Sequence, residues 1–271
     1  MPETANEAQR RHWNDATRLT AWRRREPLTA AVTGTLLEQA AVPAGESVLD
    51  VGCGGGRTTI AAAQLAGLAG GALGADLSAP MIQLARERAA AAGVGNARFA
   101  VADIQQEALD GGPFDLAISQ FGVMFFDDTV AAFASIRAQL RPGGRLAFVC
   151  WQALADNPWF TGPALQPFCP PPPPPAGKNP TGPFTLADPD YTTSVLTAAG
   201  WSRISRTPYH QLATVAREVL RDGDAYLSYL GVAADRVAEA HAASDQHLAP
   251  LLRKDGRYDA PLAFQVFTAR A

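Results

Sequence analysis

Acidic side chains recur at the ends of short apolar runs, which suggests ligand-binding chemistry along one edge of a sheet. Asp50 lies in the run 48–51, and Asp76 and Asp103 end two later runs. Because the carboxyl ends of parallel strands meet at one edge, we expect all three acids to face one ligand. Asp50 would repel a pyrophosphate but attract an ammonium or a sulfonium. An acid at the place of Asp76 can take both hydroxyls of a ribose, and Asp103 is placed to accept from an adenine amino group.

A glycine-rich turn follows the first acid. The stretch 48–60 predicts a buried strand, a turn rich in glycine and the start of a helix. Glycine lets a backbone approach a ligand closely, and the first N–H groups of the helix point at whatever binds there. The dinucleotide fingerprint requires a third glycine where this chain has Arg57. The turn by itself leaves two interpretations open, a nucleotide-type site and a purely structural connection.

The elements that must position these acids alternate between strand and helix. We expect the first strand over 48–51, the end of the second within 74–78, the third over 98–104 and the fourth over 114–119. A turn and the fifth strand are expected over 140–151. Crossover helices are expected over 58–68, 79–92 and 128–140. Ser78 and Pro80 mark the start of the second helix, as cap and first-turn residue. Further on we expect a helix over 186–199, a strand over 201–207, two helices within 215–252 and a closing strand over 262–269.

Composition fits a globular protein and argues against a polyanionic partner. The 271 residues are 47% hydrophobic and 18% charged, and the formal net charge of −3 gives no basic field for nucleic acid. Cys53, Cys150 and Cys169 are too few for a disulfide framework and lack the paired spacing of a zinc site, so we expect no metal and a reducing cytoplasm. No apolar run approaches the roughly twenty residues that cross a bilayer.

Two flanking segments have unusual compositions. Residues 6–41 are predicted to be helical, with six arginines around Trp13, Leu19 and Trp22. We favour a solvated helix face with inward tryptophans over a nucleic-acid or membrane surface, and a lid over the ligand is the second interpretation. The prolines at 170–175 favour a polyproline II rod, which we interpret as a stiff lid or spacer rather than a recognition ligand.

The motif series from 48 to 151 resembles the class I S-adenosylmethionine-dependent methyltransferases. The runs 119–126, 144–151, 157–159 and 182–184 are similar to a bacterial small-molecule branch akin to the ubiquinone/menaquinone methyltransferases. The resemblance implies an α/β fold with a seven-stranded, mostly parallel, doubly wound (Rossmann-like) sheet, an antiparallel last strand and a helical cap. It also implies S-adenosyl-L-methionine as the cofactor, lying across the carboxyl ends of the first strands.

The resemblance further implies which residues hold the cofactor and the substrate. The expected cofactor-binding residues are Trp22, Asp50, Gly52, Cys53, Gly54, Asp76, Leu77, Met81, Ala102, Asp103, Ile104, Ser119, Gln120 and Phe121. The expected substrate pocket is Trp13, Met124, Phe125, Phe126, Trp151, Trp159 and Phe160. Transfer of a methyl group requires no particular base, and His12 and His210 are the candidates for a catalytic role if a base is used.

We expect one methyltransferase domain over 1–271. Its parts are an N-terminal helical cap (1–41), a cofactor-binding core (42–152), a proline-rich lid (153–187) and a C-terminal part (188–271) with a helical insertion (215–252). The predicted function is in-line methyl transfer to O, N or C of a small, largely apolar or aromatic metabolite in biosynthesis. The alternatives are a cofactor-binding protein that does not methylate, acting in rearrangement or regulation, and a nicotinamide-dependent oxidoreductase. We expect a small-molecule substrate, no nucleic acid and no membrane, with a homodimer left open.

Overall fold

A single mixed sheet forms the centre of the computed structural model, which describes residues 5–171 and 181–271. Its strand order is β3-β2-β1-β4-β5-β7-β6. The bounds are β1 Ser47–Val51, β2 Gly71–Asp76, β3 Ala97–Val101, β4 Phe114–Gln120, β5 Leu140–Trp151, β6 Ser202–Val215 and β7 Tyr258–Arg270. The first five strands pair in parallel, and β7 runs antiparallel to both β5 and β6. The predicted seven-stranded sheet with an antiparallel last strand is confirmed.

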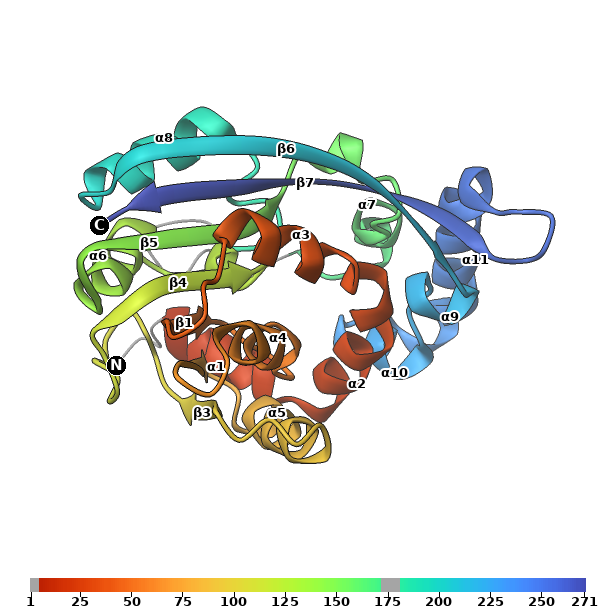
Figure 1. Cartoon of the computed structure of the whole chain (residues 1–271). Coiled ribbons are helices and arrows are strands. Elements are labelled where there is room, and N and C mark those ends of the chain that lie inside the picture. Colours follow the sequence, from red (N-terminus) through yellow and green to blue (C-terminus); the bar gives the residue numbers. More distant parts are fainter. Residues whose placement is uncertain (1–4, 172–180) are drawn as a thin grey trace.

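Helices cover both faces of this sheet, so apolar residues follow one another in its central strands without a strict alternation with polar ones. Val48, Leu49, Leu116 and Phe148 are fully buried. The helices α3 (Val32–Ala40), α4 (Arg57–Ala66) and α5 (Ala79–Ala91) pack on one face, and α6 (Thr129–Ala138) and α8 (Pro189–Ala198) pack on the other (Figure 1). Because helices pack on both faces, the sheet is doubly wound, as the resemblance implied.

Several helices begin at the residues that the sequence predicts. Ser78 accepts a hydrogen bond from the Met81 amide and caps α5, and Asp128 does the same for α6 through Ala131. Asp188 caps α8, which therefore starts three residues later than expected. These caps satisfy amide groups that the helices leave unpaired, and they fix where each chain segment leaves the sheet edge.

A helical cap lies beyond the carboxyl ends of the parallel strands. It comprises α1 (Ala5–Asn14), α2 (Ala16–Arg25), α7 (Gly162–Leu165), α9 (Arg217–Leu220), α10 (Asp224–Tyr229) and α11 (Val237–Leu248). Short 3-10 turns over 26–29, 123–125, 154–156, 166–168, 234–236 and 249–251 connect the elements. In Figure 1, β6 and β7 extend past the other strands and reach α9 and α11, so this long hairpin carries the C-terminal part of the cap.

Two boundary predictions are wrong. The sixth strand does not end near Thr207 but continues to Val215, because twelve registered positions along β6 find partners on β7. The first helix expected after 215 is broken into α9 and α10, which are separated at Gly223. The proline run 170–175 lies largely outside the described residues.

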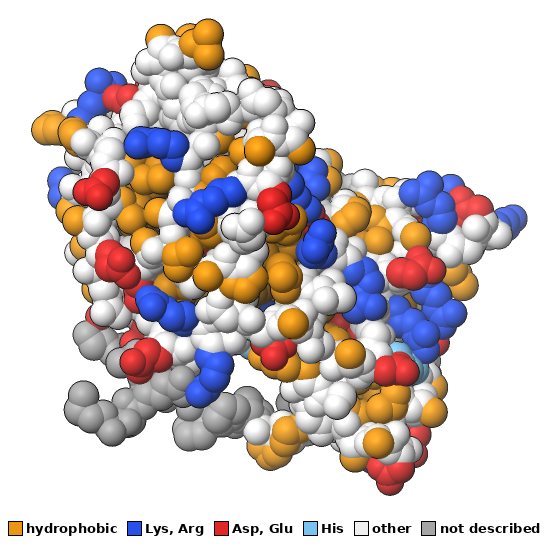
Figure 2. Space-filling model, turned by 90° about the horizontal axis from the view of Figure 1, so that it is seen from below, with side chains coloured by type: hydrophobic (Ala, Val, Ile, Leu, Met, Phe, Trp, Pro, Cys, Tyr) orange, Lys and Arg blue, Asp and Glu red, His pale blue; other side chains and the backbone are white. Residues whose placement is uncertain are grey.

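Charged side chains of both signs are mixed over the face seen in Figure 2, with hydrophobic side chains between them. This distribution agrees with the small net charge of −3. None of the helices within 5–171 and 181–271 is both long and apolar enough to span a membrane.

Candidate functional site

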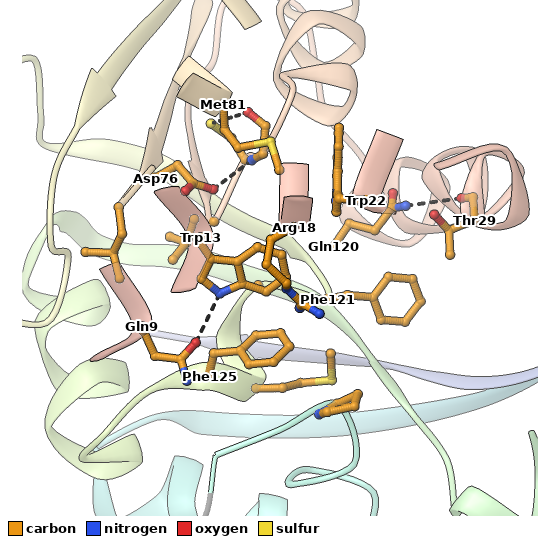
Figure 3. Close-up of a pocket in the computed structure, with 18 of the residues that line it drawn as sticks. Gln9, Trp13, Arg18, Trp22, Thr29, Asp76, Met81, Gln120, Phe121 and Phe125 are labelled. Atoms are coloured by element: carbon orange, nitrogen blue, oxygen red, sulfur yellow. Dashed lines mark hydrogen bonds between the residues drawn. The ribbon is translucent and has the colours of Figure 1, made fainter. Parts of the chain in front are cut away.

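A cavity of about 430 Å³ opens at the carboxyl ends of the parallel strands. The strand β1 and the turns after β1 to β5 form its floor, and α1, α2 and α10 cover it. Most of the side chains predicted for the cofactor line it: Trp22, Gly52, Cys53, Gly54, Asp76, Leu77, Met81, Ala102, Asp103, Ile104, Gln120 and Phe121. All of those predicted for the substrate line it as well: Trp13, Met124, Phe125, Phe126, Trp151, Trp159 and Phe160. Figure 3 shows several of these residues around one space.

The glycine turn after β1 is required for two different close approaches. Gly52 has φ +67°, and a Cβ there would lie 2.8 Å from the Cα of Gly122 in the turn after β4. Gly54 has φ +51°, and a Cβ there would lie 3.1 Å from the indole of Trp22. The turn therefore packs against backbone on one side and against the N-terminal cap on the other, at positions where glycine has little steric cost.

Asp76, at the end of β2, faces the cavity and also holds the glycine turn. One carboxylate oxygen accepts from the Gly54 amide and the other from the Ser78 amide, both at 2.9 Å. Burial is the main cause that raises the pKa of Asp76, and the two amide hydrogen bonds act against it. The carboxylate keeps further lone pairs with which to accept from a ligand.

Asp103 follows β3 and is reached by the N-terminal helix. Its Oδ2 accepts from the Asn6 side-chain amide at 2.8 Å and from Gln106 at 3.1 Å, and its Oδ1 accepts from the Gln105 amide. All of these donors are neutral. Asn6 also lines the cavity, although the sequence analysis did not single it out.

Asp50 does not line the cavity, contrary to the prediction. Successive side chains of a strand point to opposite faces, and it is Val51 that faces the cavity while Asp50 points toward α4. Asp50 is fully buried, and its Oδ2 accepts from the Thr59 hydroxyl at 2.6 Å while Oδ1 has no protein partner among the described residues. Burial raises the pKa of Asp50 to about 7, with the charge of Asp76 adding to the shift and the Thr59 hydrogen bond opposing it.

Ser119 is also absent from the cavity wall. It is fully buried, donates to the Val51 carbonyl at 2.7 Å and accepts from the Gly122 amide. Its hydroxyl thus ties the end of β1 to the turn after β4. The next residue, Gln120, does line the cavity, and its amide accepts from Thr33 at 2.8 Å and donates to the Thr29 carbonyl.

An aromatic wall closes the side of the cavity away from Asp76. Phe121 has φ +61°, which is rare for a bulky residue, and its ring stacks on Trp151 with centroids 4.0 Å apart. Trp159 continues the wall at 5.0 Å from Trp151. On the other side, Trp13 meets Phe125 edge-on at 5.4 Å. Strained backbone held by packing of this kind is frequent at ligand sites.

Neither predicted histidine lines the cavity. His12 lies on α1 beside Trp13, where its Nδ1 is 2.6 Å from the Tyr229 hydroxyl. Burial first and the Arg18 charge second lower the pKa of His12 to about 4, so its ring is neutral near pH 7. His210 lies within β6, on the outer edge of the sheet, because this strand extends beyond its expected end at 207. No group of three His, Cys, Asp or Glu side chains in the described ranges could hold a metal ion.

The arginine-rich N-terminal segment is not simply a solvated face. Arg18 and Arg25 line the cavity with Ala21 and Trp22, so this face of α2 covers the site. Tyr226 of α10 joins them, so the helical insertion predicted within 215–252 also covers the cavity. The spacing of Arg18, Trp22 and Arg25 places all three on one helix face, and this signal was available in the sequence.

Comparison with known proteins gives a consistent family. Residues 48–144 match the family described as a methyltransferase domain. The aklanonic acid methyltransferase DauC of Streptomyces sp. (strain C5) is 35% identical over 126 residues, which cover 46% of this chain and 57% of that protein. The ubiquinone/menaquinone biosynthesis C-methyltransferase UbiE of Marinomonas sp. (strain MWYL1) is 34% identical over 111 residues, or 41% of this chain and 44% of that protein. The match thus spans about half the length of these relatives.

A solved structure shares the fold over most of the chain. The YcgJ protein of Bacillus subtilis superposes with a TM-score of 0.59 over 89% of this chain and 97% of its own, at 18% sequence identity. At that identity the likeness establishes the arrangement of the sheet and its helices.

Proposed function

We propose that this chain, whose residues 48–144 match a methyltransferase domain, is an S-adenosylmethionine-dependent methyltransferase that methylates a small, largely apolar or aromatic metabolite. This proposal rests on one observation. The same cavity is lined by the carboxylates of Asp76 and Asp103, whose hydrogen-bond donors are neutral, and by a wall of aromatic rings. Its volume of about 430 Å³ is within the range of small-molecule sites.

The polar end of the cavity fits the nucleoside part of S-adenosylmethionine. We propose that Asp76 accepts from the ribose hydroxyls and that Asp103 accepts from the adenine amino group. The apolar side chains of Leu77, Met81 and Ile104 border the same end and would flank the adenine ring. The two acceptors match the hydroxyl and amino groups of an adenosine, and the apolar side chains match its flat ring.

When bound, S-adenosylmethionine supplies a methyl group on a positively charged sulfur. The protein's contribution is then to position and orient the acceptor atom in line with that methyl group. The stacked pair Phe121 and Trp151 and the edge-on pair Trp13 and Phe125 present rigid surfaces for a planar acceptor and keep water away. We assign no general base, because His12 is engaged with Tyr229 outside the cavity wall.

The names of the two relatives point to small molecules as substrates, one to aklanonic acid and one to ubiquinone and menaquinone biosynthesis. We carry over only the substrate class. We also propose a cytoplasmic location, because the three cysteines are unpaired, which suits a reducing compartment. A cofactor-binding protein that does not methylate remains the alternative.

Incubation of the purified protein with methyl-labelled S-adenosylmethionine tests the proposal. Separate reactions contain a bacterial metabolite extract, a tRNA pool, a DNA pool and a protein pool. We expect label in the small-molecule fraction of the extract alone. Label in a macromolecular pool with a blank small-molecule fraction would reject the substrate class, and blank fractions together with tight cofactor binding by calorimetry would favour the non-methylating alternative.

A further inference from the structure

Arg18 is a cation inside the aromatic part of the cavity. Its guanidinium lies over the Trp13 ring, 4.8 Å from the centroid, and over the Tyr226 ring at 5.2 Å. One of its terminal nitrogens donates to the Tyr226 hydroxyl. Figure 3 shows the side chain directed into the pocket beside Trp13.

The other cationic side chains of the cavity wall have carboxylate partners. Arg25 pairs with Asp222 at 2.5 Å, and Arg57 pairs with Glu26 at 3.3 Å. For Arg18 no carboxylate within 5–171 and 181–271 comes within the 4.0 Å of an ion pair, and its Nε is buried without any hydrogen-bond partner. A buried donor atom without a hydrogen-bond partner is costly unless something binds it.

The geometry around Arg18 suits a planar anion. A guanidinium offers a fixed fork of donors that matches a carboxylate, and two aromatic rings hold this fork in one orientation. The Arg18 charge is the second cause, after burial, that lowers the pKa of the neighbouring His12, and the Asp15 carboxylate acts against it. The surrounding cavity is largely apolar, which strengthens such an ion pair relative to water.

The anion could belong to the acceptor or to the amino-acid part of the cofactor, and the contacts favour the acceptor. The glycine turn, next to which the amino-acid part would lie, is covered by Trp22, one helical turn after Arg18. Arg18 is instead bound to Tyr226 of α10 and borders Trp13, which in turn packs on Phe125. Trp13 and Phe125 form the edge-on aromatic pair opposite the Phe121–Trp151 stack, and both belong to the predicted substrate pocket.

We propose that Arg18 binds a carboxylate of the acceptor, so that the substrate is an aromatic or apolar acid anchored through its anionic group. This inference rests on the proposed small-molecule methyltransferase function and narrows its substrate class. Arg18 acts as a specificity residue that orients the acceptor, and the methylated atom lies elsewhere on the molecule.

Paired probes of equal shape test the proposal. Binding of 2-naphthoate and of the neutral 2-naphthamide is measured by tryptophan fluorescence, with and without saturating S-adenosylhomocysteine. The parent protein should bind the acid about 10-fold or more tightly than the amide, the scale for a charge-assisted pair. Arg18→Met should abolish that preference, Arg18→Lys should keep part of it, and Arg23→Met, an exposed change on the same helix, should leave it intact.

Two further results would overturn the assignment. Equal affinity of the parent protein for acid and amide would show that no anion is recognised. If Arg18→Met weakens S-adenosylhomocysteine but not 5′-methylthioadenosine, which lacks the carboxylate, the partner of Arg18 is the cofactor instead. Failure of S-adenosylhomocysteine to bind the parent protein would count against the proposed function, and the acid preference measured without it would still decide the role of Arg18. Thermal melts of each variant verify folding.

Discussion

Asp76 links the structure of the site to its proposed chemistry at the scale of one residue. The same carboxylate that should bind the ribose also accepts from the amides of Gly54 and Ser78, and so fixes the turn after β1 relative to the start of α5. A side chain with both functions orders the site before the ligand arrives, which reduces the entropy lost on binding.

Asp76→Ala should therefore weaken S-adenosylmethionine binding by about 1.5 to 3 kcal/mol, the scale for hydrogen bonds to a charged group. Calorimetry measures the affinity, and circular dichroism verifies the fold. Asp110→Ala, an exposed change that does not touch the cavity, is the control. A folded Asp76→Ala protein with the affinity of the parent would remove the ribose assignment.

Gly54→Val should abolish cofactor binding, because the new side chain would have φ +51° and would meet the Trp22 ring. Gly93→Val is the matched control, since Gly93 has φ +67° with no atom within 4 Å of its Cβ position. Both variants carry backbone strain, and only the first should lose binding in calorimetry. Equal losses in both variants would attribute the effect to strain and not to the site.

Asp50 should make stability depend on pH. Its pKa of about 7 in the fold exceeds its ordinary 3.8, so the native protein holds a proton that the unfolded chain releases. This contribution is complete below about pH 4 and is lost as the pH rises through about 7.

Asp50→Asn removes this titration. Relative to the variant, the parent protein's unfolding free energy should fall by about 1.4 kcal/mol per pH unit between about pH 5 and pH 6, and less steeply as the pH approaches about 7. Urea denaturation across that interval measures it, with Asp110→Asn as the exposed control. Parallel curves for parent and Asp50→Asn would show that Asp50 does not titrate in this range.

At the scale of elements, α1 and the segment after the proline run meet across the cavity mouth. Asn6 binds Asp103 on the adenine side, and Gln9 donates to the Thr181 hydroxyl at 3.3 Å. The Trp13 carbonyl accepts from Ser78, which ties the end of α1 to the cap of α5. The apolar side chains of Ala8 and Trp13 in α1 are only half-buried, so we expect these polar links to contribute to holding α1 closed.

Hydrogen exchange should therefore slow in residues 5–22, 157–171 and 181–184 when cofactor and acceptor bind, because both covers close on the ligands. Mass spectrometry of peptides at saturation measures it. The helix α8, which packs on the far face of the sheet, is the internal control and should not change. Unchanged exchange in all three segments would make them spacers and not lids.

At the scale of the whole molecule, one buried carboxylate joins three distant parts of the chain. Asp222, whose side chain is 2% exposed, pairs with Arg25 of α2 and accepts from Thr161 before α7 at 2.9 Å. The N-terminal, middle and C-terminal parts of the cap are thus held together beside the cavity, although α9 and α10 are attached to the sheet through the long β6–β7 hairpin.

Asp222→Asn should lower the unfolding free energy by about 3 kcal/mol, because it leaves the Arg25 guanidinium partly buried without its counter-charge. Thr161→Val, which removes only the neutral hydrogen bond, should cost about 1 kcal/mol. Urea denaturation compares the two variants, and limited proteolysis should cut the Asp222→Asn protein first within 217–231. Equal losses of stability would show that the ion pair does not hold the cap.

The sequence by itself determined the sheet and the edge at which the site lies. Apolar runs at βαβ spacing, the glycine turn and the acids at 76 and 103 are local signals, since strand ends and helix caps depend on neighbouring residues. The aromatic residues of the pocket were expected from the resemblance to the methyltransferases. The strand β6 was too short in the prediction because its extension depends on pairing with β7, a partner about fifty residues away in the chain.

Only the tertiary structure decided which side chains face the cavity. Asp50 and Asp76 look equivalent in the sequence, but Asp50 is in register with Gly74, two residues before Asp76, so it lies further back in the sheet under Thr59 of α4, whereas Asp76 ends β2 at the cavity. Arg18 was one arginine among six in the N-terminal segment, and its contact with Tyr226, 208 positions away, places it in the pocket. Such contacts arise from the packing of distant segments, and their burial and charge balance cannot be read from local spacing.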